Sequence, residues 1–490
     1  MNAAEVTFLS VYFMMAAGSA IACILFGFLL LHVSRNRVHI FFPVMLFLMT
    51  FMGITDAALS GRSLDLNLLS LEAASESGTR LPSKVMLAFL IGLSIVVVVA
   101  NIFDRSRKIV GSPSLLWGLL TFYVSCALVP AAFGYEPHFI IALVYTPVVF
   151  YALFTSAPND PGRLVLFAKL SMASIAGLSL IAIFVIPPVV LESGYRGLVP
   201  GLDKRLWGLA SHANVLGPVA LTLLILEWAE PFRTRVIHYG VLAMALATIL
   251  LTQSKTSILA GIVAFGVIFV YRLNAGIGAS LGSGTQQQRS NKFLLAAAGL
   301  FLVVVTLAFV AYLLAGDMLP ARLNFLDRVA VENLQTGSGR QPIWNAAIVE
   351  GWRSPYFGYG LQIWEREFRI SRALFTAFHA HNQVLQVFSL AGFFGLLGFT
   401  VYVAILAAAS FRYAAATGGA TLALFSMLLV RSITEVPLQI SAPTSGDFLS
   451  HLAFVFYLVA CGLRARVMPT QAGVVRGTKA IPSNLSVALL

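Results

Sequence analysis

The sequence predicts an all-α polytopic membrane protein with about 12–13 transmembrane helices and one large loop, containing short helices, outside the membrane. Of the 490 residues, 59% are hydrophobic and only 11% are charged, whereas about a quarter of a soluble domain is charged. Apolar runs of about 18 or more residues, as transmembrane helices require, recur along the chain. The runs do not alternate as barrel strands would, so helices are expected to satisfy the backbone hydrogen bonds within lipid.

The expected spans share length and apolar composition. They are residues 9–33, 41–58, 85–103, 114–133, 139–156, 165–190, 212–229, 237–252, 256–272, 293–315, 384–409, 417–436 and 447–463. We divide the chain into N-terminal transmembrane helices (1–164), a region 165–440 that includes the large loop 316–383, a last transmembrane helix (441–466) and a cytoplasmic tail (467–490).

Lysine and arginine collect in short loops, and span counting places all of these loops on one side. The positive-inside rule makes that side cytoplasmic. The net charge of +12 therefore reflects topology and contact with membrane lipids. No basic stripe with interleaved aromatic residues indicates nucleic-acid binding. The basic loops contain residues 35–37, 105–108, 163, 233–235, 272, 412 and 464–466.

The opposite, outer side receives residues 60–83, 191–211, 253–256 and the large loop. Within the loop, Pro342 predicts the first turn of a helix that Gly351 ends. A second amphipathic helix is expected from Leu361 onward and should lie on the membrane surface.

Two outer turns carry cations. Arg205 precedes His212 and Asn214, where the asparagine is a natural helix cap. Lys255 lies in a tight turn between two spans, and backbone N–H groups at such a helix start suit a phosphate. The alternative for Arg205 and Lys255 is that both side chains only reach toward lipid headgroups, and for the second turn that it is an ordinary hairpin.

The large loop supplies a cation and two histidines. Arg340, after Gly339, offers a planar fork that matches phosphate oxygens, or is simply a solvated residue at a helix start. His379 and His381 precede Asn382, and a neutral imidazole can accept a proton from a sugar hydroxyl. The alternative is a helix cap. We predict no metal site, because the i,i+2 spacing separates the histidines on a helix and no acidic residue or cysteine lies nearby.

Arg431 and Glu435 form an i,i+4 pair inside an apolar run, where ionisable residues are costly. They either orient a site or pair structurally. Three cations (Arg205, Lys255 and Arg340) and the base candidate His381 share the outer side. This set suits a lipid diphosphate, whose leaving group the cations would neutralise while the base activates an acceptor hydroxyl.

The order of these motifs over residues 165–440 resembles the O-antigen ligase and polysaccharide polymerase family of bacterial inner-membrane glycosyltransferases. The motifs are Arg205…Gly208…His212-x-Asn214, Ser254-Lys255-Thr256-Ser257, Gly339-Arg340…Trp344…Pro355…Gly358-Tyr359-Gly360, and His381-Asn382 before a span with Gly392, Gly395 and Gly398. Lys255 stands where the family commonly has arginine, and Ala213 where many members have proline.

The resemblance implies a periplasmic site that takes a glycan from undecaprenyl diphosphate without a metal or other cofactor. His381 would be the catalytic histidine, and Arg205, Arg340 and Lys255 would contact the diphosphate. The supporting residues would be His212, Asn214, His379, Asn382, Arg431 and Glu435. The acceptor, a second glycan in a polymerase or lipid A-core in a ligase, stays open. A flippase or exporter of the same lipid-linked glycan is the alternative, but it would need ionisable residues deep in several spans.

Overall fold

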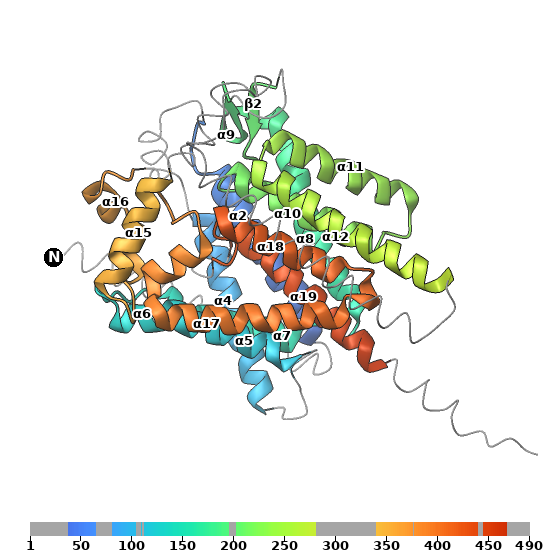
Figure 1. The fold of residues 1–490 in the computed structure, drawn as a ribbon, viewed down its shortest axis with the longest axis horizontal. Helices are drawn as coiled ribbons and strands as arrows, with labels where there is room; N and C mark the ends of the chain where they lie inside the picture. Colours follow the sequence, from blue (N-terminus) through green and yellow to red (C-terminus); the bar gives the residue numbers. More distant parts are fainter. Residues whose placement is uncertain are drawn as a thin grey trace, which may run out of the picture.

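The computed structural model describes residues 38–64, 81–103, 109, 112–195, 202–280, 340–375, 377–439 and 444–467. Within these ranges the chain is a bundle of apolar helices with one short hairpin (Figure 1). Eight described helices are long and apolar enough to cross a membrane, and three shorter apolar helices accompany them. The predicted all-α membrane fold is confirmed. Two expected spans, 9–33 and 293–315, lie outside the described residues.

The described elements follow the predicted order of spans. They are η1 (Val38–Ile40), α2 (Phe41–Ala58), α4 (Leu81–Phe103), α5 (Pro113–Tyr123), η2 (Val124–Leu128), α6 (Val129–Phe133), α7 (Ala142–Ser156), α8 (Pro161–Val185), α9 (Pro187–Val190), β1 (Leu191–Ser193), β2 (Lys204–Leu206), α10 (Ala213–Ala229), α11 (Arg235–Thr252), α12 (Lys255–Ser280), α15 (Gln341–Arg353), η4 (Leu361–Trp364), α16 (Arg366–Ser371), α17 (Gln383–Tyr413), η5 (Ala415–Thr417), α18 (Ala420–Thr434) and α19 (Gly446–Val467).

Helix α19 forms the centre of the described bundle, with 83% of its apolar window buried. Its aromatic side chains contact neighbouring helices on two sides. Phe456 meets Phe42 of α2 edge to face at 4.8 Å, and Phe448 stacks on Phe150 of α7 at 5.3 Å. Inside a membrane such contacts stabilise through van der Waals packing, because lipid tails are as apolar as the side chains.

One end of the bundle holds a buried ion cluster among α8, α10 and α11. Lys169 and Glu227 pair at 2.7 Å, with side chains 4% and 0% exposed. His238 lies 2.7 Å from the second oxygen of Glu227, and Arg464 pairs with the adjacent Glu230. The described basic loops gather around this end, which we call the basic end. The predicted site residues lie at the other end.

At that other end, a two-stranded hairpin pairs β1 with β2 antiparallel, with Glu192 opposite Arg205. Arg62, just after α2, holds the segment that contains the hairpin. Its guanidinium donates to the carbonyl oxygens of Val189 (2.9 Å), Gly208 (2.6 Å) and Ala210 (2.9 Å). These bonds give hydrogen-bond partners to Val189 in α9 and to Gly208 and Ala210, which lie in the buried stretch without regular structure between β2 and α10.

Helix α17 is broken near its start, and the loop completes the break. Gly392 has φ +62°, so the helical hydrogen bonds stop there. The Ser389 and Leu390 carbonyls accept instead from the N–H groups of Tyr359 and Gly360 (2.8 and 3.1 Å). In return, the N–H groups of residues 393 and 394 donate to the carbonyls of residues 355 and 356. We call these four hydrogen bonds the clasp. The clasp joins the loop to a membrane span and gives partners to backbone groups at the break in the helix.

The first predicted loop helix is confirmed as α15, with Pro342 in its first turn. The prediction that Gly351 ends it is wrong, since α15 runs on to Arg353. A side chain at Gly351 would stand 2.4 Å from the ring of Phe388, so this glycine permits close packing on α17. The second predicted helix is divided into η4 and α16, and part of its apolar face is buried in a small core with α15. That core includes Ile343, Ala347, Tyr359, Ile363, Trp364 and Phe368.

The clasp predicts unequal costs for two glycine substitutions. Gly358 has φ +72°, and an added Cβ would lie 2.3 Å from the backbone nitrogen of Ala391. Gly358→Ala should therefore cost more than the roughly 1–2 kcal/mol of a left-handed residue alone. The matched control is Gly240→Ala, because nothing lies within 4 Å of a Cβ there and α11 should be slightly stabilised. Thermal loss of the monodisperse peak in detergent measures both; equal midpoints would contradict the clasp.

Candidate functional site

The site is built around the carboxylate of Glu435. This residue is extended, with φ −146° and ψ −178°, and directly follows the end of α18. Its Oε1 accepts from the Asn214 amide at 2.8 Å and from Arg340 Nη2 at 3.0 Å. Its Oε2 lies 3.2 Å from His381 Nδ1 and 3.9 Å from His379 Nε2. One carboxylate thus contacts residues from three separate stretches of sequence.

These contacts keep the buried carboxylate ionised. Burial alone raises the pKa of Glu435, but the hydrogen bond from His381 and the positive charge of Arg340 outweigh it. The net result is a pKa well below the usual range for a glutamate. At neutral pH the centre of the site is therefore a fixed negative charge surrounded by donors.

Asn214 links this carboxylate to the second arginine. Its Oδ1 accepts from Arg205 Nη2 at 2.7 Å, while its amide N–H donates to Glu435. Arg205 also donates from Nε to the Thr252 carbonyl at 3.0 Å and lies 4.5 Å from the centre of the Tyr195 ring. The expectation that Asn214 caps a helix is wrong. The cap of α10 is His212, so the asparagine amide is available to bridge Arg205 and Glu435.

Two His-Ala-X turns lie side by side in the site and have the same geometry. His212 Nδ1 accepts the backbone N–H of Asn214, and His379 Nδ1 accepts that of His381, each at 3.1 Å. Burial and the nearby charge of Arg205 lower the pKa of His212 to about 3. Burial, and to a smaller extent the neighbouring His381 ring, lower the pKa of His379 to about 3. Both rings are therefore neutral and carry their proton on Nε2, which makes them donors.

His381 has the opposite arrangement. Its Nδ1 faces Glu435, and an ionised carboxylate can only accept, so the ring proton lies on Nδ1. Nε2 then keeps a lone pair and can accept a proton. The backbone of His381 is left-handed, with φ +48°, a conformation that costs a non-glycine residue about 1 kcal/mol or more and often marks functional positions. Of these three histidines, His381 is the one oriented as a base.

The fold also brings a potential metal-ligand set together. The sequence predicts no carboxylate beside the two loop histidines, but Glu435 approaches them from 54 positions away. Donor atoms of His379, His381 and Glu435 lie within 4.8 Å of one another. However, hydrogen bonding places protons on the two nitrogens that would have to bind the metal, and Arg340 already pairs with the carboxylate. This donor set therefore fits a divalent cation poorly.

Asn382 caps α17, so the helix cap at this junction is the asparagine and not the histidine pair. Its Oδ1 accepts the backbone N–H of Leu385 at 3.0 Å in the first turn of α17. Its amide donates to the Ile433 carbonyl at 3.0 Å. Asn382 thus ties the start of α17 to the end of α18, next to Glu435, and so fixes the distance between His381 and its carboxylate.

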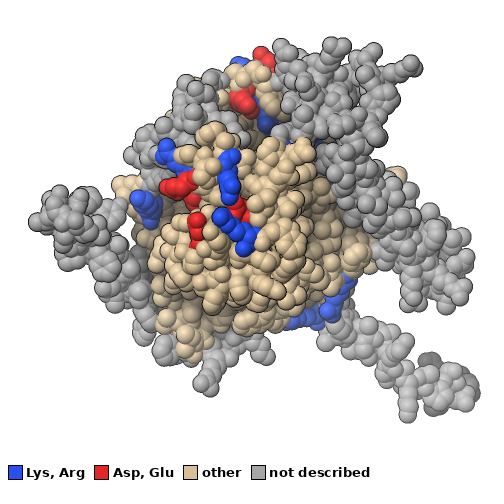
Figure 2. Space-filling view, turned by 60° about the vertical axis from the view of Figure 1, so that its left-hand side comes forward, with Lys and Arg blue, Asp and Glu red and all other residues tan. Residues whose placement is uncertain are grey.

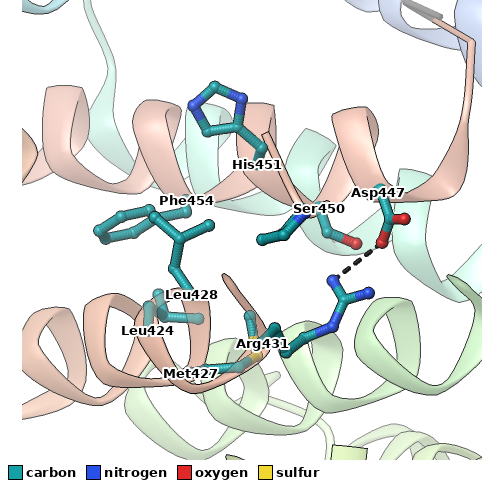
Figure 3. Close-up of a pocket in the computed structure, with 9 residues that line it drawn as sticks. Leu424, Met427, Leu428, Arg431, Asp447, Ser450, His451 and Phe454 are labelled. Atoms are coloured by element: carbon teal, nitrogen blue, oxygen red, sulfur yellow. Dashed lines mark ion pairs between the residues drawn. The ribbon is translucent and has the colours of Figure 1, made fainter. Parts of the chain in front are cut away.

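The predicted pairing of Arg431 with Glu435 is wrong. The N–H of Glu435 still donates to the Arg431 carbonyl at 2.8 Å, but the extended backbone of Glu435 takes its side chain away from the helical i,i+4 position. Arg431 instead extends toward α19 and pairs with Asp447 at 2.8 Å (Figure 3). Its Nη2 donates to the Asn214 carbonyl at 3.0 Å. Asp447 thereby leaves Glu435 free for the site, and this pair links α19 to the start of α10.

Apolar and polar side chains of α18 and α19 surround this ion pair (Figure 3). A small cavity there has room for about one water molecule and is lined by Arg431, Asp447, Ser450 and His451 among others. Sequence reasoning missed both Asp447 and Arg62. The signal for Asp447 was present, since an acidic residue at the start of an apolar run needs a partner.

The predicted cations thus gather at one end of the bundle. Arg205 and Arg340 join the Glu435 network directly. Lys255 is half-buried at the start of α12, near the Thr252 carbonyl that binds Arg205; among the described residues it has no hydrogen-bond or ion-pair partner. In the space-filling view, basic and acidic side chains gather together beside a broad surface with few charges (Figure 2). Three cations against one carboxylate leave this site net positive.

One segment of the chain matches a known protein family. Residues 240–400 match the family model described as O-Antigen ligase. The chain is a polytopic membrane protein of the glycan-transferring class. Over this segment the chain is similar to the O-antigen ligase family, in agreement with the family that the motif order predicts. No curated protein matches the chain. The matched segment contains Lys255, Arg340 and His381, whereas Arg205 and Glu435 lie outside it.

The Arg431–Asp447 pair predicts strong coupling between two substitutions. Asp447→Leu should leave a buried uncompensated guanidinium and cost about 3–5 kcal/mol. The double variant Arg431→Met/Asp447→Leu should recover much of that loss, because no charge is then left buried. A double-mutant cycle on thermal midpoints in detergent measures the coupling; additive effects would show that Asp447 does not act through Arg431.

Proposed function

We propose that this protein transfers a glycan from undecaprenyl diphosphate to an acceptor hydroxyl at the periplasmic face of the bacterial inner membrane. The observation that supports this most strongly is the position of Glu435. One ionised carboxylate orients His381 as a base and holds Arg340 beside it. A base and a cation are the two groups that glycosyl transfer from a diphosphate requires.

Arg205, Arg340 and Lys255 would bind the diphosphate. Each guanidinium has five N–H donors, and two of these bind protein acceptors among the described residues for Arg205 and for Arg340. The remaining donors can contact phosphate oxygens, and charge-assisted hydrogen bonds of this kind are about twice as strong as neutral ones. Lys255 adds a point charge at the start of α12. The cations stabilise the negative charge that grows on the leaving diphosphate.

His381 would act as general base. As the acceptor oxygen attacks the anomeric carbon, Nε2 takes the hydroxyl proton and a new glycosidic bond forms. The bond from the anomeric carbon to the phosphate oxygen breaks, and the electron pair leaves with the diphosphate. The imidazolium that results is stabilised by Glu435 at Nδ1. Neutral His379 and His212 would donate hydrogen bonds without competing for the proton.

An enzyme fits the arrangement better than the alternative flippase. A flippase would need a charged central path, with ionisable residues deep in several spans. Among the described residues, the candidate cations gather at one end, and the buried Lys169–Glu227 pair at the basic end is internally neutralised. A ligase, with lipid A-core as acceptor, and a polymerase, with a second lipid-linked glycan, share the donor contacts described here. The proposal covers both acceptors.

Removing the base should abolish transfer. His381→Ala removes Nε2, and loss of a general base typically slows the reaction about 10²–10⁴-fold. The assay follows glycan transfer by purified protein in liposomes that contain lipid-linked donor and acceptor. The matched control is His39→Ala, which removes an exposed imidazole in η1. A folded His381→Ala protein with wild-type transfer would refute the assignment.

We further propose that transfer needs no metal ion. The arginines supply the charge stabilisation that a divalent cation would otherwise provide, and the hydrogen-bonded imidazoles suit a metal poorly. EDTA should therefore leave the initial rate of the purified, reconstituted protein unchanged. Inhibition by EDTA that added Mg²⁺ or Zn²⁺ reverses would show that the trio of His379, His381 and Glu435 binds a catalytic cation.

A further inference from the structure

Helix α15 lies across the direction of the long span α17 and of α11 and α12, at the end of the bundle that carries the site (Figure 1). Its inner face is settled. Ile343, Ala347 and Gly351 are buried against the loop core and α17. A helix that crosses the spans at their ends runs along the membrane surface.

The outer face of α15 is apolar and exposed along its second half. Val349 and Trp352 have 59% and 60% of their side-chain surface exposed, and Tyr356, just past the helix end, has 71%. Ile348, beside Val349, is 39% exposed. Val349 and Trp352 are three residues apart in α15 and so share one helical face, and Tyr356 adds an exposed ring just beyond the helix end. A stripe of this size on a loop helix is unusual for a surface in water.

This stripe is continuous with the side chains that a spanning helix turns outward. Trp352 contacts Phe388 and Phe393 of α17 edge to face at 5.5 and 5.8 Å. Phe393 and, one turn further, Leu397 are 47% and 63% exposed on α17, where lipid is the expected neighbour. A surface that continues from a lipid-facing span without a polar break shares the same environment.

We propose that an apolar face of α15, formed by Ile348, Val349 and Trp352 and continued by Tyr356, is inserted in the membrane–water interface on the periplasmic side of the inner membrane. The occupant of this face is bilayer lipid. Tryptophan and tyrosine are the residues enriched at this depth, since their rings are amphipathic. Arg353, on the same turn, pairs with the buried Glu350 at 3.3 Å, lies over the Tyr135 ring at 4.3 Å and keeps 45% of its side chain exposed, so a cation stands beside the apolar face. In the second loop helix, expected from its sequence at the membrane, Trp364 and Phe368 are buried, whereas Ile370 is 54% exposed.

Membrane insertion of α15 would also set the depth of the site. Arg340 directly precedes α15, so an interfacial helix holds its guanidinium near the level of lipid headgroups. This consequence rests on the proposed function, because only a lipid-linked diphosphate would make that depth useful. The insertion itself does not depend on the activity.

Spin-label accessibility in the full chain tests the insertion. The three native cysteines are replaced by alanine, and Val349→Cys is labelled in nanodiscs of phosphatidylethanolamine and phosphatidylglycerol. Leu397→Cys is the lipid-facing reference and Asp203→Cys, exposed in the hairpin segment, is the aqueous reference. The ratio of oxygen to nickel-complex collisions at residue 349 should match that at residue 397 and exceed that at residue 203 several-fold. Ile348→Cys gives a second reading if one variant folds poorly.

Two results would overturn the proposal. A collision ratio at residues 348 and 349 equal to that of residue 203 would place the face in water. A label that is immobile and inaccessible to both reagents would show that protein covers the face, and dipolar broadening between labels would identify a second copy of the chain. These readings are independent of glycan transfer, so an inactive protein can still show the inserted helix, and an active one can lack it.

Discussion

The site depends on one buried carboxylate held between cations and imidazoles. Glu435 compensates Arg340, accepts from Asn214 and fixes the tautomer of His381. Without its charge, Arg340 and the proton accepted by His381 would repel each other at close range. With it, a base and a cation can stand side by side in a partly desolvated pocket. The proposed function needs this arrangement, because a base must take up a proton next to the cations that would bind the diphosphate.

Three structural devices bring the carboxylate and its partners together from distant parts of the chain. Arg62 holds the carbonyls of the segment that leads into α10. The clasp across Gly358 and Gly392 attaches the loop to α17. The Arg431–Asp447 pair joins α19 to α10. Because Asp447 is the counter-ion of the buried Arg431, the Glu435 carboxylate pairs with Arg340 instead. Each device satisfies groups that would be costly to leave unpaired in a membrane.

Much of this could be predicted from sequence, and the failures have physical causes. The length of the apolar runs predicted the described spans. Counting these spans placed the cations and His381 on the same side, and the structure brings them to one end of the bundle. The Arg431–Glu435 pairing failed because a helix end, which sequence locates only to within a few residues, lies between them. Asn214 was expected to cap α10 because asparagine is a common cap. His212 caps the helix instead, because its Nδ1 can accept the same backbone N–H. Contacts between residues more than 100 positions apart, such as those of Arg62, leave no local periodicity in the sequence.

The central claim is that the charge of Glu435 orients His381 and balances Arg340. Glu435→Gln tests it most directly, because the amide keeps the size of the side chain and removes the negative charge. The measurement is the initial rate of glycan transfer by the reconstituted, folded variant. The account predicts a loss of roughly 10²–10⁴-fold, comparable to the loss of an orienting carboxylate in a catalytic triad. A rate within a few-fold of wild type would contradict it.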